Sequence, residues 1–224
     1  MTMSEDRVAR RWSRGGMPNR IYDFTIKHEG LYRLESRLVW GADNRAFYAE
    51  LDSLRDLPAG SKVLDMPCGG GVAFRGLRPE MDIRYVAADV SEFMLARARA
   101  TAARRGLTDI EYVHTNVERM PFEDGGFDVC LNYNGLHCFA DPPAALAEMA
   151  RVTRPGGTLR GTVVVSGGPS LSAKAIAFFQ RTDQFGPGGS AADVTRWLTG
   201  AGFDELRLER RGACLFFTAR RAAA

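Results

Sequence analysis

Apolar residues are spaced in two ways along this chain, and the change of spacing divides it. Between residues 19 and 57 they recur every three or four positions, for example at Leu31, Leu34 and Leu38, which predicts helices. After this region, short apolar runs alternate with longer stretches of helical spacing. Such alternation is typical of strands connected by crossover helices.

Five apolar runs predict the strands of a parallel sheet, at residues 62–66, 83–90, 110–117, 127–133 and 157–165. Helical patterns follow the second and the fourth run, over 91–106 and 141–157. Ser91 is placed to cap the first of these helices and Gly106 to end it. The first run leads through a glycine-rich turn into a further helix.

The C-terminal part departs from this rhythm. A helical pattern at 191–202 is followed by two strand patterns, 203–211 and 213–221, with only Gly212 between them. So short a connection suits antiparallel strands. We therefore predict an α/β fold with a doubly wound, mostly parallel seven-stranded sheet, an antiparallel C-terminal edge hairpin, N-terminal helices and a lid insertion at 166–190 before the last helix.

The chain is predicted to have three regions. Residues 1–18 are expected to be a disordered basic tail, 19–57 a helical cap, and 58–224 the main domain, without internal repeats. Residues 1–20 hold five arginines against Glu5 and Asp6, which accounts for the whole net charge of +3. A basic arm could hold a phosphate or a nucleic acid, but we interpret it as a solvated, partly disordered tail and expect no nucleic-acid partner.

Composition excludes several other classes of protein. No apolar run approaches the ~20 residues of a membrane-spanning helix, and the N-terminus lacks the apolar core of a secretion signal. We therefore expect a cytoplasmic protein without a membrane partner. The four cysteines and three histidines are dispersed, which supports neither a disulfide framework nor a metal site. The oligomeric state is not readable.

Polar residues stand at the ends of the first strands of the predicted sheet. Asp65 ends the first strand and begins the turn "DMPCGGG"; Asp89 ends the second, and Asn116 lies near the end of the third. Ligands of open parallel sheets lie beyond these carboxyl ends. Asp89 can accept hydrogen bonds from ribose hydroxyls, and the Asn116 amide suits an adenine edge. Together they predict a site for an adenosine-containing ligand.

In these motifs the chain resembles the class I S-adenosylmethionine-dependent methyltransferases, a Rossmann-like family, and within it the type 11 group that includes ubiquinone and menaquinone biosynthesis enzymes. "VLDMPCGGG" is similar to the family's first motif, and "NVERMPFEDGGFDV", "NGLHCFAD" and "RVTRPGGTL" follow in the family's order. The resemblance implies S-adenosyl-L-methionine as the methyl donor. The cofactor-binding residues that it implies are Asp65, Met66, Pro67, Gly69, Gly71, Asp89, Val90, Met94, Asn116, Val117, Glu118, Asn132, Tyr133 and Asn134.

Two departures from the family pattern bear on cofactor binding. Pro67 replaces the first glycine of the motif, so this position neither adopts a positive φ nor donates an N–H. Asn116 stands where an aspartate is common, and keeps the acceptor without the charge. A nicotinamide-dependent oxidoreductase is the alternative with the same fold; Phe74, where that fingerprint has its third glycine, argues against it. A non-catalytic nucleoside-binding module stays open.

The methyl acceptor is expected to be a small apolar or aromatic metabolite. His137, just after the fourth strand, is the candidate base, with packing or helix capping as its other explanation. The Asp-Pro-Pro of residues 141–143 comes too late for the motif of nucleic-acid base methylation and suits a helix start. Candidate acceptor-binding residues from the N-terminal cap and the lid are Tyr22, Trp40, Phe178, Phe179 and Phe185. The methylated atom is not readable.

Overall fold

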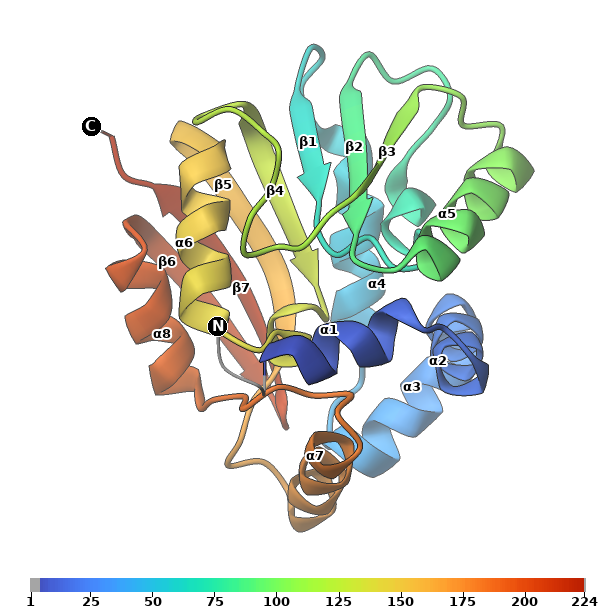
Figure 1. Cartoon of the computed structure of the whole chain (residues 1–224), viewed down its shortest axis with the longest axis vertical. Helices are drawn as coiled ribbons and strands as arrows, with labels where there is room; N and C mark the ends of the chain where they lie inside the picture. The colour runs from blue at the N-terminus through green and yellow to red at the C-terminus, as the bar shows by residue number, and fades with distance from the viewer. Residues whose placement is uncertain (1–4, 224) are drawn as a thin grey trace.

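The computed structural model describes residues 5–223, and their strands form one twisted sheet (Figure 1). The strand order is β3-β2-β1-β4-β5-β7-β6, with β1 to β5 parallel and β7 antiparallel to both β5 and β6. The predicted seven-stranded fold is therefore confirmed. The strands are β1 (Lys62–Asp65), β2 (Arg84–Asp89), β3 (Ile110–His114), β4 (Phe127–Tyr133), β5 (Thr153–Val164), β6 (Phe203–Arg211) and β7 (Cys214–Arg221).

Helices cover both faces of the sheet because successive strand residues point to opposite sides. Val63 of β1 packs in a cluster with α4 (Arg45–Asp52) and α5 (Glu92–Arg105). The next residue, Leu64, packs on the other side with α6 (Pro142–Val152) and α8 (Ala191–Gly200). Figure 1 shows the two helical layers on either side of the strands.

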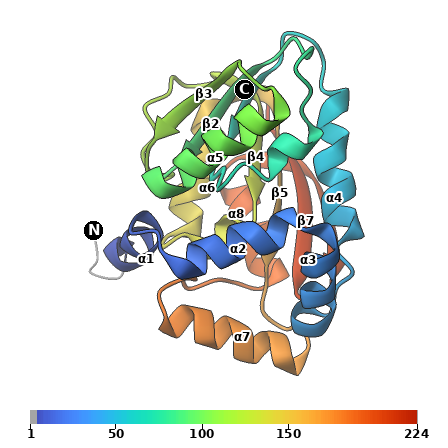
Figure 2. The ribbon, with the colours of Figure 1, turned by 90° about the vertical axis from the view of Figure 1, so that its right-hand side faces the viewer.

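The remaining helices lie beyond the carboxyl ends of the parallel strands, at the bottom of Figure 1. They are α1 (Glu5–Ser13), α2 (Met17–Lys27), α3 (Glu29–Glu35), the π-helix η1 (Ser36–Trp40) and α7 (Ser170–Arg181). Figure 2 shows α2 crossing in front of the strand ends, with α7 below it. The N-terminal cap and the lid insertion thus meet over the edge of the sheet where strand order reverses between β1 and β4.

Three sequence-based expectations differ from the structure. Residues 5–18 were expected to be disordered, but 5–13 form α1, and the Trp12 indole anchors this helix by donating to the Gln184 carbonyl at 2.9 Å. Residues 1–4 lie outside the described part. The helix expected after the glycine turn is only a 3₁₀ turn, η3 (Ala73–Gly76), because Gly76 lies against α4 with no room for a side chain. β5 begins at Thr153, before its predicted start.

Short 3₁₀ turns complete the connections, at η2 (Ser53–Asp56) and η4 (Leu136–Cys138). Within residues 5–223, no helix combines the length and apolar character needed to span a membrane.

Candidate functional site

A cavity of about 490 Å³ lies between the carboxyl ends of the strands, the N-terminal helices and α7. Its size is in the range of small-molecule sites, and its lining is mostly apolar with a few polar groups. The predicted site residues that line it are Asp65, Met66, Pro67, Gly69, Asp89, Val90, Met94, Asn116, Val117, Glu118, Tyr133, Asn134, His137, Tyr22, Trp40, Phe178, Phe179 and Phe185. Residues far apart in the sequence thus line the same cavity.

The glycine turn forms one wall through its backbone. Gly69 has φ +52° and Gly71 has φ +81°, conformations that other residues adopt only with strain. The amide of Gly69 donates to Asp89 Oδ2 at 2.9 Å, which joins the turn after β1 to the end of β2. A Cβ on Gly69 would point toward Met94 Cε, 3.6 Å away, so a side chain there would reduce the space beside the turn.

Asp89 is held in place by backbone donors from two sides. Its Oδ1 accepts from the Ser91 amide and its Oδ2 from the Gly69 amide, both at 2.9 Å. Burial raises its pKa to about 6, against the opposing effect of these hydrogen bonds. Each oxygen keeps a second lone pair. Asp89 therefore supports the turn and can still accept hydrogen bonds from a diol.

Asp65 is the more deeply buried of the two acids, with 1% of its surface exposed. Burial raises its pKa to about 8, the neighbouring Asp89 adds to this, and a hydrogen bond from the Tyr85 hydroxyl at 2.9 Å opposes it. At neutral pH the protein alone therefore keeps Asp65 mostly protonated. A cationic group in the cavity would favour its ionised form.

The end of β3 contributes a wall with one amide. Val117 is buried, and Asn116 Oδ1 accepts from the Glu118 amide at 3.1 Å. Val90, directly after β2, and Met94, in the first turn of α5, also line the cavity. Apolar side chains around a single amide suit a flat heterocycle with a polar edge.

Two predicted cofactor-binding residues do not line the cavity. Asn132 is fully buried, where its Nδ2 donates to the Met66 carbonyl at 2.7 Å and its Oδ1 accepts from the Leu136 amide at 3.0 Å. It fixes the end of β4 to the turn after β1. Gly71 faces the ring of Phe74, and its neighbour Gly70 lines the cavity instead.

An aromatic wall closes the other end of the cavity. Trp40 from η1 and Phe185 from the lid stack with ring centroids 6.3 Å apart, and Phe179 lies 4.9 Å from Phe185. Tyr22 and Phe178 complete the predicted set. Tyr32 and Trp12 also line the cavity. Sequence reasoning missed Trp12, whose position on the inner face of α1 depends on how this helix packs.

Asn134 organises the polar part of this end. Its Nδ2 donates to the Tyr32 hydroxyl at 3.1 Å, and its Oδ1 accepts from the Thr162 hydroxyl at 2.8 Å. Its side chain also interacts with the hydroxyl of Tyr22, whose pKa is raised by burial. The backbone of Asn134 has φ +56°, a strained conformation that often accompanies a functional site.

His137 does not have the properties of a general base. Its Nδ1 accepts from the Val164 amide at 3.1 Å, so the ring proton resides on Nε2. Burial lowers its pKa to about 3. The ring packs edge-on against Phe185, with centroids 4.4 Å apart. The structure thus favours the packing explanation, because the only nitrogen left for a ligand is a donor.

Glu35 is an acid in the cavity that sequence reasoning missed. It ends α3 and lines the cavity, and burial raises its pKa. Among residues 5–223 its carboxylate has no hydrogen-bond or ion-pair partner, which distinguishes it from Asp65 and Asp89. The sequence signal was a lone carboxylate among the apolar residues of a helix, a pattern that a solvated helix face produces equally well.

Helix α2 is joined to α5 by an ion pair and lies in close contact with the glycine turn. Asp23 is buried, with Lys27 Nζ at 2.6 Å from its Oδ1 and Arg97 Nε at 2.6 Å from its Oδ2. A Cβ on Gly70 would overlap Asp23 Oδ1. The ion pair between Asp23 of α2 and Arg97 of α5 therefore holds α2 over the strand-end side of the cavity. No cluster of metal-ligating side chains occurs in residues 5–223.

Comparisons with known proteins agree with this geometry. Residues 64–160 match a family model described as a methyltransferase domain, of the type 11 group. The chain is 31% identical over 141 residues to a demethylmenaquinone methyltransferase of Bacillus mycoides, covering 62% of this chain and 59% of that protein. It is 37% identical over 123 residues to the mitochondrial 2-methoxy-6-polyprenyl-1,4-benzoquinol methylase of Leishmania donovani, covering 48% and 42%. The chain thus spans less than two thirds of either relative's length.

Among solved structures, a SAM-dependent methyltransferase from Aquifex aeolicus superposes with a TM-score of 0.60. It is 23% identical, and the match covers 84% of this chain and 93% of that one. This similarity shows a shared fold.

Proposed function

Because residues 64–160 form a class I S-adenosylmethionine-dependent methyltransferase domain of the type 11 group, we propose that this protein methylates a small, apolar, aromatic acceptor that carries a hydroxyl group. The observation that carries the proposal is the continuity of one cavity. Its strand-end side offers acids and a glycine turn, and its helical side offers an aromatic wall with two tyrosines and the carboxylate of Glu35.

The strand-end side fits the donor. Asp89 would accept from the ribose hydroxyls, and Val90, Met94 and Val117 would enclose the adenine beside the Asn116 amide. Asp65 would face the amino group of the methionine portion, whose charge would ionise the buried carboxyl. When bound, S-adenosylmethionine supplies an electrophilic methyl group on a positively charged sulfur.

The helical side would position the acceptor and exclude water. Trp40, Phe179 and Phe185 would stack on its ring, while Tyr22 and Tyr32, held by Asn134, would orient its polar substituent. Alignment of a nucleophile in a closed cavity can supply ~7–11 kcal/mol of the barrier. Glu35 would accept the proton that the acceptor hydroxyl loses, and the donor, after giving up its methyl group, would leave as S-adenosylhomocysteine.

A nicotinamide-dependent oxidoreductase fits the site less well. Phe74 occupies the position of the third glycine and packs against Gly71, so the turn does not open toward a pyrophosphate.

Titration calorimetry with S-adenosylhomocysteine, NAD and NADP tests the donor side. Turnover of labelled S-adenosylmethionine with a panel of phenols, catechols and hydroquinones tests the acceptor side. Tight binding of the nucleoside together with methylation of ring hydroxyls supports the proposal. Binding without turnover of any hydroxyl acceptor would favour the non-catalytic module, and preference for NAD would favour the oxidoreductase.

A further inference from the structure

The exposed large apolar side chains are concentrated on one side of the protein. Nine such side chains are exposed within the described residues, and eight belong to α2, α3, η1 and α7. The ninth, Leu208, lies on the edge strand β6. Scattered exposed apolar residues are ordinary on a protein surface, whereas a contiguous group marks a contact surface.

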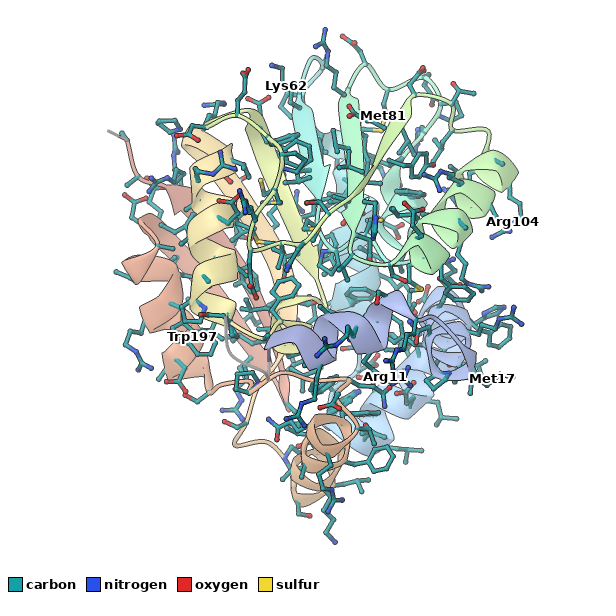
Figure 3. All side chains as sticks on the ribbon, viewed as in Figure 1. Arg11, Met17, Lys62, Met81, Arg104 and Trp197 are labelled. Carbon is teal, nitrogen blue, oxygen red and sulfur yellow. The ribbon has the colours of Figure 1, made fainter. Side chains whose placement is uncertain are left out.

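On the N-terminal helices these residues follow a helical stripe. They are 50% to 65% exposed, and within α2 and from α3 into η1 they recur at intervals of three or four, so each of these helical segments has an apolar outward face. The members of the stripe are Met17, Ile21, Phe24, Leu31, Leu34 and Leu38. Helices α2 and α3 pack against each other and face the viewer together in Figure 2. Figure 3 shows Met17 at the outer edge of the molecule.

Helix α7 continues this surface on the other side of the cavity. Leu171, Lys174, Phe178 and Arg181 are spaced by three and four residues and are all exposed, so apolar and basic side chains alternate on its outer face. α7 packs against η1. Phe178 and Ile21 are exposed and also line the cavity, so the surface adjoins the place where the cavity opens.

The charge of this surface is basic. Arg20, Lys174 and Arg181 are exposed, whereas the acids of the same four elements are buried or half-buried. These acids are Asp23, Glu29 and Glu35. We call the outward side of α2, α3, η1 and α7 the apolar–basic face. Two copies meeting through it would bring like charges together, whereas an anionic lipid surface complements both its charge and its apolar residues.

We propose that the apolar–basic face rests on an anionic lipid bilayer and that the acceptor enters the cavity from the lipid, between α2 and α7. The second part rests on the proposed function. Apolar side chains on amphipathic helices enter the headgroup region, while lysine and arginine reach lipid phosphates. The sequence predicts no membrane partner because it lacks a spanning segment; attachment to a membrane surface requires none.

Flotation with vesicles tests the proposal without knowledge of the acceptor. Wild-type protein is mixed with phosphatidylcholine vesicles or with vesicles that also contain phosphatidylglycerol. The apolar variant is Phe24→Ser/Leu34→Ser/Leu38→Ser, at residues that are exposed and do not line the cavity. The charge variant is Arg20→Glu/Lys174→Glu, and Leu208→Ser is the matched control on the far edge strand. Calorimetry with S-adenosylhomocysteine verifies that each variant is folded.

We expect wild-type protein to bind anionic vesicles more tightly than phosphatidylcholine vesicles. Binding to the anionic vesicles should weaken roughly tenfold or more in the apolar and charge variants and should be unchanged in the control. Absence of wild-type binding to anionic vesicles, or equal binding by the apolar variant, overturns the proposal. So does a wild-type dimer in light scattering that the apolar variant abolishes, since a second copy then covers the face. Nucleoside affinity is measured separately, so a wild-type protein that binds the nucleoside but not anionic vesicles refutes the docking and leaves the proposed function standing.

Discussion

The two ends of the cavity are built in different ways. At the end proposed for the methyl donor (the donor end), consecutive strand tips place Asp65, Asp89 and the glycine turn, and backbone amides fix Asp89. At the acceptor end, helices and a lid bring together side chains from residues as distant as Trp12 and Gln184. Local chain geometry therefore determines the donor end, whereas the packing of separate segments determines the acceptor end. Substitutions at the two ends should have separable effects.

The largest effect is expected from Gly69→Val at the donor end. A β-branched side chain at φ +52° is strained and would occupy space beside the turn. We expect nucleoside binding to fall by more than about 100-fold, roughly the effect of 3 kcal/mol, measured by calorimetry. Gly60→Val is the control, because its φ of +78° imposes similar strain but its Cβ meets nothing within 4 Å. Normal binding by Gly69→Val would remove the turn from the donor end.

Glu35→Gln should give the clearest separation between an effect on turnover and an effect on donor binding. The amide keeps the size of the side chain but cannot accept a proton, so kcat should fall by about 10²–10⁴-fold while affinity for S-adenosylhomocysteine stays unchanged. Glu29→Gln, on the same helix but outside the cavity, is the matched control.

His137→Asn should reduce kcat less than about tenfold, since the His137 ring lacks the properties of a base. The reverse ranking of Glu35 and His137 would restore the histidine as base.

Asp65→Asn should weaken donor binding by about 10–100-fold, the effect of losing a hydrogen bond to a charged group. In the wild type, binding at pH 7 should release close to one proton, because the cationic amino group ionises a carboxyl whose pKa is about 8. Calorimetry in phosphate and in Tris buffer measures this release, which the variant should lack. Equal proton release by both proteins would exclude Asp65 as the partner of the amino group.

Asp65→Asn should also stabilise the ligand-free protein against unfolding. The folded-state pKa of Asp65 is raised, so its favourable neutral form is fully populated at low pH and is lost as pH rises through about 8. The gain in unfolding free energy of Asp65→Asn over the wild type should therefore grow from about pH 4, the ordinary aspartate pKa, and level off above pH 8. Denaturant melts across this range measure it.

The smallest effect is expected from Trp12→Phe at the acceptor end. Phenylalanine keeps most of the ring but loses the hydrogen bond from the indole to the Gln184 carbonyl, at 2.9 Å. A neutral hydrogen bond contributes about 0.5–1.5 kcal/mol, so the KM of the acceptor should rise only a few-fold, with donor affinity unchanged. A larger loss of donor affinity would show that the two ends are not separable at α1.

The donor end was largely predictable from sequence because polar residues at strand ends and positive-φ glycines are local signals. Asp65, Asp89 and Gly69 lie where they were expected. Asn132 was not distinguishable from a ligand-binding residue, because its position at a strand end is the same whether its amide faces a ligand or the backbone of the neighbouring turn.

The acceptor end was predictable only in its composition. The aromatic residues of the cap and the lid line the cavity as expected, but the distinction between His137 and Glu35 depends on tertiary contacts. The Val164 amide removes the acceptor nitrogen of His137, and no periodicity reveals this. Helix α1 escaped prediction because the arginines that suggested a solvated tail surround Val8 and Trp12, whose burial requires the rest of the fold.

The ion pair of Asp23 with Lys27 and Arg97 has a consequence for the order in which ligands enter. Moving α2 away from α5 would separate the buried Asp23 carboxylate from Arg97, so we expect this helix to stay in place while substrates exchange. Both ligands would then enter along the side of α2 that faces α7. The nucleoside would have to bind before the acceptor, because a bulky acceptor would block this route.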